Sequence, residues 1–490
     1  MNLFLVGPTI ALVLLFVTAM VIWADPIKAY VQSMLAFVAF SSVAVLVSLI
    51  TGPETIKALL VSMSVGALVV SWILIRPQQF IFTIRNLVYL ASFTSLVIGS
   101  QMVARTFGLS SIAFTDGYII MLLGLDFQSG DNSHTQSGLA GLKRGFGLPA
   151  MQSLGSEGEY FVGLMPLFFL GAILATVWLV LILTNSWAQA MPVVTLFLVF
   201  VLSTEAITRH AFLINTHSIA WMLTALLLVY LRRQLMGDLD GRDAAGLVLL
   251  FSVIGLLRAD YVILFGAFTL FFVLQNAATR PRLAIGIILA QGAAAVVWMT
   301  TTIVAFPFLG AVGPFIIFSG GMVASGLVVR LMWVRKRRVS IYLPTGLVVL
   351  ASALLATTLI LSNTSDSVRS LAINLFAGEG LWGFSIFAAL LVWVGSYIRP
   401  QVLDRSFIKN AAAVGALTIS LYLFSKYGDG VGQGYSDSGF SRIGFGDSLN
   451  RTMVTWLPFL VLPLIRLVGT VSKTGTRDRG WAKRGGRATR

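Results

Sequence analysis

One carboxylate in this sequence has surroundings suited to chemistry. Asp116, in the segment Phe-Thr-Asp-Gly-Tyr, follows an apolar run and precedes a short apolar stretch. A carboxylate at the height of lipid headgroups can take a proton from a hydroxyl or hold a divalent ion against a lipid phosphate. Aspartate is also a favoured helix N-cap, so capping of the following stretch is the structural alternative.

Arginines beside apolar runs are candidates for binding a phosphate. Arg258 and Asp260, in LLRADY, interrupt an otherwise apolar stretch, where ionisable groups usually face a bundle interior or a water-filled cavity. Arg442, Asp447 and Arg451 precede the last apolar run. A guanidinium can donate two hydrogen bonds to a phosphate, and Asp260 could hold Arg258 in place. The alternatives are a tight turn with two mutually satisfied charges, and ordinary interface anchoring.

A third group of polar residues lies in STEAITRHAFLINTHSIAW. Glu205 and Arg209 are four residues apart and can pair on one helical face. His210 and His217 are seven apart, a spacing that also places two residues on one face of a helix. The structural alternative is a Glu–Arg pair that only orients the loop.

A possible metal site is the set Asp126, Asp131 and His134, which are hard or borderline ligands in a polar loop. Their spacing matches no specific metal-binding rule, and solvated loop residues are the alternative. A divalent metal ion therefore stays open as a cofactor. The absence of cysteine excludes iron–sulfur clusters and thiolate zinc.

The elements that must position these residues are membrane helices. The 490 residues are 57% hydrophobic and 11% charged, whereas a soluble domain is about a quarter charged. This composition excludes a soluble enzyme with one anchor, a disordered chain and an outer-membrane barrel. We expect an all-α polytopic membrane protein of about 13–15 transmembrane helices, with a long outer loop that carries short interfacial helices, one of them over 118–125. The apolar runs cover residues 3–23, 32–51, 58–75, 87–104, 160–183, 186–203, 212–231, 244–257, 261–276, 285–306, 314–331, 341–361, 381–398, 410–425 and 452–470.

Alternating the connections between these runs separates the charges. Most of the 34 basic residues fall on one side, which the positive-inside rule makes cytoplasmic. Most acidic residues and all three histidines fall on the other side, together with two long connections, 105–159 and 426–451. The pattern predicts a multi-pass protein of the cell membrane with a cytoplasmic C-terminus and its active site on the outer face. The basic tail, 471–490, is expected to lie against anionic lipid, and we expect no nucleic-acid partner.

The order of the outer-face segments resembles that of the GT-C class of integral-membrane glycosyltransferases. An apolar run is followed by a long loop with an early acid, Asp116, then by KRGFGLPAMQSLGSEGEYFVGLMP and by LLRADY, within residues 85–300. The loop has one acid where many members have a pair, and there is no WWDYG-type signature. On this resemblance, 1–84 are additional N-terminal transmembrane helices, 85–470 form the core with both outer loops, and 471–490 are the tail.

The resemblance implies transfer of a sugar from a polyprenyl-phosphate donor, at the outer face, to a hydroxyl of a glycan, lipid or protein acceptor. Asp116 would be the general base and the configuration would invert. Charge and depth, not a family motif, indicate Arg258 with Arg442 or Arg451 as the donor-phosphate site. The supporting residues would be Glu205, Arg209, His210, Asp260 and Asp447.

Two other functions remain open. An O-antigen ligase- or polymerase-like enzyme would also act outside on lipid-linked glycans, and Glu205, Arg209 and His210 would then matter more than Asp116. A lipid or solute transporter predicts charges buried at mid-depth in several spans and a paired repeat. The sequence has its charges mainly at the outer boundary and shows no repeat, so transport ranks third.

Overall fold

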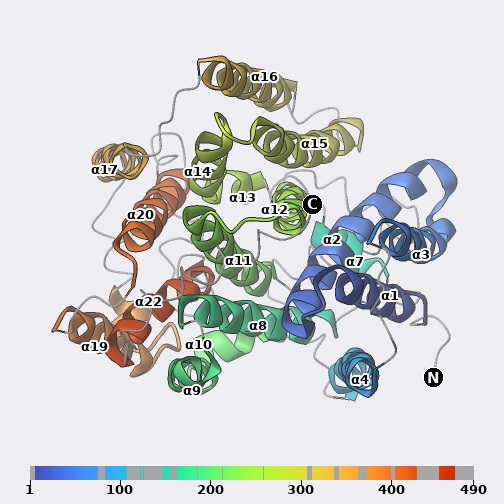
Figure 1. The fold of residues 1–490 in the computed structure, drawn as a ribbon, viewed down its shortest axis with the longest axis horizontal. Coiled ribbons are helices and arrows are strands. Elements are labelled where there is room, and N and C mark those ends of the chain that lie inside the picture. Colours follow the sequence, from blue (N-terminus) through green and yellow to red (C-terminus); the bar gives the residue numbers. More distant parts are fainter. Residues whose placement is uncertain are drawn as a thin grey trace, which may run out of the picture.

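The computed structural model describes most of the hydrophobic chain, and all of its regular structure there is helical (Figure 1). The described residues are 6–75, 83–106, 122, 125, 147–154, 163–184, 186–211, 213, 215–257, 259–305, 312–335, 342–361, 372–398, 403–427 and 452–468.

Each apolar run in the sequence coincides with one or two helices. In chain order these are α1 (Val6–Trp23), α2 (Pro26–Thr51), α3 (Ile56–Ile75), α4 (Ile84–Thr106), α8 (Leu164–Thr184), α9 (Trp187–Ser203), α11 (His217–Met236), α12 (Gly241–Leu257), α13 (Ala259–Leu264), α14 (Gly266–Asn276), α15 (Pro281–Ala305), α16 (Val312–Val334), α17 (Leu343–Leu361), α19 (Ser385–Ile398), α20 (Arg405–Tyr427) and α22 (Leu457–Val468). Shorter pieces are η2 (Pro53–Thr55), α7 (Gly147–Gln152), α10 (Glu205–Thr208), η5 (Arg209–Ala211) and η8 (Met453–Trp456).

Six helices in the described part of the chain are long and apolar enough to cross a membrane, and they lie in α2, α3, α4, α8, α11 and α20. The chain is therefore an all-α, multi-pass membrane protein, as its composition predicts. Shorter apolar helices of 10–17 residues occupy other predicted spans, among them Gly266–Asn276 and Ser385–Ile398. The larger count of about 13–15 spans remains a prediction.

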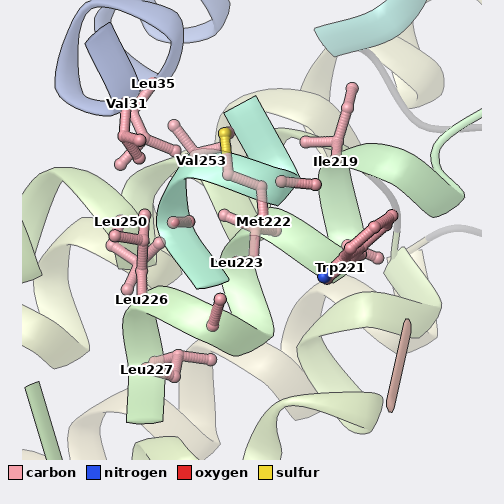
Figure 2. Packing of buried hydrophobic residues seen from close by; sticks show 14 of the residues in the cluster. Val31, Leu35, Ile219, Trp221, Met222, Leu223, Leu226, Leu227, Leu250 and Val253 are labelled. Carbon is pink, nitrogen blue, oxygen red and sulfur yellow. The ribbon is translucent and has the colours of Figure 1, made fainter. Parts of the chain in front are cut away.

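Helix α11 forms the centre of the bundle. Every residue from His217 to Leu231 is buried, and the helix packs against α8, α12, α20 and α22. Figure 2 shows Leu226 of α11 beside Leu250 of α12, with side chains of α2 near Met222. Because no lipid-facing side remains over these turns, the helix reads as continuously apolar instead of amphipathic.

Buried polar contacts join α11 to its neighbours. The indole N–H of Trp221 donates to Thr176 Oγ1 on α8 at 2.9 Å. Gln32 Nε2 on α2 donates to the Tyr230 hydroxyl at 2.8 Å. A side chain at position 246 of α12 would place its Cβ only 2.3 Å from that hydroxyl, so Gly246 leaves the space that Tyr230 fills. In a membrane, close packing and such hydrogen bonds drive helix association.

The N-terminal helices are joined to the rest of the bundle through α2, and α1 also packs against α4. Helix α1 packs against α2 and α3, and α2 packs against α8 and α12 (Figure 1). The Tyr30 hydroxyl of α2 also donates to the carbonyl of Leu167 in α8 at 2.9 Å. The boundary at residue 84 between additional helices and core remains a prediction, because helix packing does not show where a core begins.

One end of the bundle carries a set of basic loops, which we call the basic end and define by Arg232, Arg233, Arg242 and Arg280. Their guanidinium groups make four contacts with other connections of the chain. Arg242 donates to the Ile22 carbonyl and Arg280 to the Leu239 carbonyl, each at 2.8 Å, Arg232 pairs with Asp404 at 3.0 Å, and Arg233 pairs with Asp243. These contacts bring the four connections together at one end of the bundle, and the prediction that all the basic connections share one side of the membrane stays a prediction. Their cytoplasmic location stays a prediction from the charge bias.

At the basic end, α12 begins with a reciprocal capping pair. Asp240 Oδ1 accepts from the Asp243 backbone N–H at 2.8 Å, and Asp243 Oδ2 accepts from the Asp240 N–H at 3.3 Å. This is a capping box, in which two side chains satisfy two backbone donors that the helix leaves open. The hydrogen bond from the Asp243 N–H is the main reason that the pKa of the Asp240 carboxyl lies below its ordinary value.

We predict that Asp240→Ala speeds hydrogen exchange in the first turn of α12, most at the Asp243 amide. Loss of such a cap costs about 1 kcal/mol, or about fivefold in exchange at neutral pH. Because the folded pKa is lowered, the stabilisation is complete above the unfolded value of about 3.9 and is lost as the pH falls through the folded pKa. The ratio of variant to wild-type exchange should therefore shrink below about pH 4. Asp240→Asn keeps a capping oxygen and should stay near wild type; equal acceleration in both variants would contradict the cap.

Two details differ from the simplest pattern of spans. The apolar helix α9 ends at Ser203, and the next helical segment, Glu205–Ala211, is inclined to α9 by 84°. Helix α7, from the long loop 105–159, has all six residues buried and packs against α2 and α12. It is therefore not an interfacial helix on the surface. The predicted interfacial stretch 118–125 lies outside the described residues except for positions 122 and 125.

Candidate functional site

Buried polar side chains gather where α11 begins, at the end of this helix opposite to the basic end. We call this region the histidine end and define it by His210, Asn215, Thr216 and His217. All four side chains are buried, and His210 is 0% exposed. A polar group is buried only at a cost unless it has a partner, so the contacts of these residues decide what the region can do.

The two histidines meet through a turn, not along one helix. Arg209–Ala211 is a short 3-10 helix and α11 begins at His217, so the expectation of one continuous helical face is wrong. The imidazole rings nevertheless contact each other edge to face, with centroids 5.3 Å apart. The Ser218 hydroxyl donates to the His210 carbonyl at 3.0 Å and ties the turn to the helix.

Asn215 fixes the orientation of His210. Asn215 Oδ1 accepts from the backbone N–H of His217 at 3.0 Å, so its Nδ2 is the atom that faces His210 Nδ1, at 3.1 Å. An amide nitrogen donates, and Nδ1 therefore accepts. In the neutral ring the proton then resides on Nε2. This tautomer presents an N–H from the far side of the His210 ring.

Two pairs of hydroxyl groups also lie at this end. The Thr216 hydroxyl lies 2.6 Å from the Tyr261 hydroxyl on α13, and the Tyr422 hydroxyl of α20 lies 2.9 Å from Thr452 Oγ1. Helix η8, which follows Thr452, packs against α11, and α13 packs against α20. Two candidate phosphate ligands lie close to these pairs in the sequence, since Arg258 is three residues before Tyr261 and Arg451 directly precedes Thr452.

Glu205 and Arg209 form the predicted ion pair. Arg209 Nε donates to Glu205 Oε1 at 2.9 Å, and the second guanidinium contact reaches the same oxygen. Their side chains are 56% and 43% exposed, so the pair lies on the surface while the adjacent His210 points inward. The pairing is confirmed, and the three residues do not share one environment.

The other candidates lie largely outside the described residues. This holds for Asp116, Asp126, Asp131, His134, Arg258, Arg442, Asp447 and Arg451. Asp260 belongs to α13, whose backbone is described, but its side chain is not. No cluster of three potential metal ligands occurs within the described part, which leaves the Asp126, Asp131 and His134 proposal untested.

The described interior contains few charges. Among the residues whose burial is described, no lysine, arginine or glutamate is buried, and Asp243 is the buried carboxylate. Asp243 lies at the basic end in contact with Arg233, not at mid-depth. The pattern of charges buried along several spans, which transport predicts, is not seen in these residues.

Several residues of this end could not be identified from the sequence. Asn215, Thr216 and Tyr261 are ordinary polar residues in apolar surroundings, and the Thr216–Tyr261 contact joins positions 45 apart. Gln152 on α7 is likewise buried, and its carboxamide has no hydrogen-bond partner among the described residues. Polar residues near the ends of apolar runs were a usable signal, but which of them meet depends on helix packing.

Comparison with known proteins adds no relative: no family model, no curated protein and no solved structure matches this chain.

Proposed function

We propose that the protein is a membrane glycosyltransferase. It would take a sugar from a polyprenyl-phosphate donor and transfer it, with inversion, to a hydroxyl of a cell-envelope glycan, lipid or protein at the outer face. The observation that carries the proposal is the buried polar cluster of the histidine end, together with the Thr216–Tyr261 and Tyr422–Thr452 pairs. Arg258 and Arg451 lie close to Tyr261 and Thr452 in the sequence. The order of outer-face segments that resembles the GT-C class supports the same assignment.

The proposed chemistry assigns one role to each group. Asp116 takes the proton of the acceptor hydroxyl as its oxygen attacks the anomeric carbon. The bond from that carbon to the phosphate oxygen breaks, and the polyprenyl phosphate leaves from the opposite face. Arg258, with Arg442 or Arg451, stabilises the negative charge that develops on the leaving phosphate. Asp260, Asp447 and the polar side chains at the start of α11 would position these groups.

Label transfer tests the proposal. Membranes that contain the protein are supplied with a polyprenyl-phosphate sugar labelled in the sugar, and label is followed into acceptors of the cell envelope. Membranes from the same host without the protein are the control. Transfer that depends on the protein supports the proposal, and no transfer from a panel of such donors contradicts it.

A ligase-like reaction on lipid-linked glycans is the second candidate. It is favoured by the exposed Glu205–Arg209 pair, which lies next to His210 at the histidine end. Such a reaction would move a whole glycan from its lipid carrier, and the exposed pair would contact the substrate. Lipid or solute transport remains the third candidate, and the described interior offers it no buried charge at mid-depth.

We predict that Glu205→Gln leaves the fold intact, because an exposed ion pair is worth about 0–1 kcal/mol. Thermal unfolding in detergent should therefore match that of the wild-type protein. The variant then separates the two candidates: sugar transfer from a monosaccharide donor is unchanged if Asp116 is the base, whereas glycan ligation is lost if the pair is catalytic. Arg209→Lys keeps the positive charge but cannot make both hydrogen bonds to Glu205. If the pair is catalytic, the ligation rate of this variant should lie between those of the wild-type protein and Glu205→Gln.

A further inference from the structure

The basic end carries a groove that the proposed reaction at the histidine end does not use. It lies where the turn between α14 and α15 meets the first turns of α12, and its volume is about 700 Å³. Its floor consists of small and aliphatic side chains, and two arginines stand at its rim. The residues that define it are Ala244, Ala245, Val248, Arg280, Arg282 and Leu283.

The shape of the groove follows from helix packing. Gly286 has no side chain, so Val248 of α12 lies against the backbone of α15, and a Cβ at that glycine would be 3.5 Å from it. One turn earlier, Ala244 and Ala245 line the groove together with Pro281 and Leu283, and the two alanine side chains fill little of the space. The small residues of α12 therefore leave the space open at its basic end.

The charge at the rim is positive. Arg280 donates one hydrogen bond to the Leu239 carbonyl, and Arg282 is exposed and makes no ion pair within the described part of the chain. Among nearby acids, the Asp240 carboxylate accepts the Asp243 backbone N–H as a helix cap, and Asp243 is paired with Arg233. A guanidinium that has no carboxylate of its own is suited to bind a phosphate.

An apolar track leads away from this rim along α15. Pro281 lines the groove, and Ile285 and Leu289 follow at intervals of four residues, which places all three on one face of the helix. Ile285 is 40% and Leu289 55% exposed. A site with a cationic rim and an apolar track matches a molecule that has an anionic head and a hydrocarbon tail.

We propose that this groove binds an anionic phospholipid of the membrane leaflet at the basic end. The phosphate is held by Arg282 and Arg280, with the Thr279 hydroxyl also at the rim, and one acyl chain lies along Pro281, Ile285 and Leu289. Basic residues near a membrane surface attract anionic lipid in general, and here the groove gives that attraction a defined place.

Native mass spectrometry of the full-length protein in mild detergent tests the proposal. Phosphatidylglycerol and phosphatidylcholine with identical acyl chains are added in turn, and the bound fraction of each is measured. Wild-type protein should retain more phosphatidylglycerol. Arg282→Gln should lower phosphatidylglycerol binding about fivefold, as expected for one basic residue near a surface, and leave phosphatidylcholine unchanged. Ala245→Trp fills the groove without changing the charge and should reduce the retention of both lipids.

The matched control is Arg335→Gln, which removes an exposed arginine that does not line the groove. It should bind both lipids like the wild-type protein. Equal losses in Arg282→Gln and Arg335→Gln would show diffuse attraction in place of a site. Wild-type levels in both Arg282→Gln and Ala245→Trp, or no preference for phosphatidylglycerol in the wild-type protein, would also overturn the proposal.

Discussion

Sugar transfer should fall by about 10²–10⁴-fold when Asp116 is replaced by Asn, because the proposed reaction then lacks its general base. The measurement is the rate of label transfer from the polyprenyl-phosphate sugar, at equal amounts of folded protein in the membrane. Asp126→Asn removes a carboxylate from the same loop and should leave the rate within a factor of a few, as should Glu205→Gln.

The choice of asparagine separates catalysis from helix capping. Asparagine caps a helix about as well as aspartate, so Asp116→Asn keeps a cap and removes only the ability to take a proton. A full rate in this variant would exclude Asp116 as the base and turn attention to Glu205, Arg209 and His210. A lower rate with less folded protein would instead indicate a structural role, which thermal unfolding in detergent measures directly.

The largest loss of stability is expected from Trp221→Ala. Trp221 is fully buried in α11, contacts Phe169 and Phe197 edge to face at 5.6 and 6.0 Å, and donates to Thr176. Its removal leaves a large cavity between α8, α9 and α11 and takes away the hydrogen bond that the Thr176 oxygen accepts, so we expect a cost of about 3–5 kcal/mol. Figure 2 shows the indole on the side of α11 away from Leu250.

Thermal unfolding in detergent, followed by circular dichroism, measures this effect. Trp187→Ala is the matched control, because Trp187 is 54% exposed at the start of α9 and its removal creates no internal cavity. Trp221→Phe keeps most of the ring volume but loses the hydrogen bond, and its midpoint should lie between those of the wild type and Trp221→Ala. Similar midpoints for Trp221→Ala and Trp187→Ala would contradict a central packing role for Trp221.

The helices could be predicted from the sequence because membrane helices need only a long enough apolar run. The runs 32–51, 212–231 and 410–425 illustrate this, since each coincides with a helix of sufficient length. The 84° bend after Ser203 could not be predicted. It depends on contacts with a distant segment, where the Ala206 N–H donates to the Leu381 carbonyl and the Thr204 and Ser385 hydroxyls are hydrogen-bonded.

The candidate site could be predicted only where it is local in sequence. Glu205 and Arg209 are one helical turn apart, so spacing alone predicts their pairing. The orientation of His210 depends on Asn215 and on the irregular turn between them, which no periodic pattern describes. The contact between Tyr422 and Thr452 similarly requires α20 and η8 to come together.

The hydrogen bonds at the basic end also hold one end of α11 to several neighbouring helices. Arg232, Arg233, Arg242 and Arg280 join the ends of α1, α11, α12, α14 and α20 there. A helix of 20 residues is about 30 Å long. If α11 tilted by about 5° about its last turn, His217 at its other end would move by about 3 Å. A small change in the tilt of α11 would therefore alter the contacts of the two histidines more than those at the basic end.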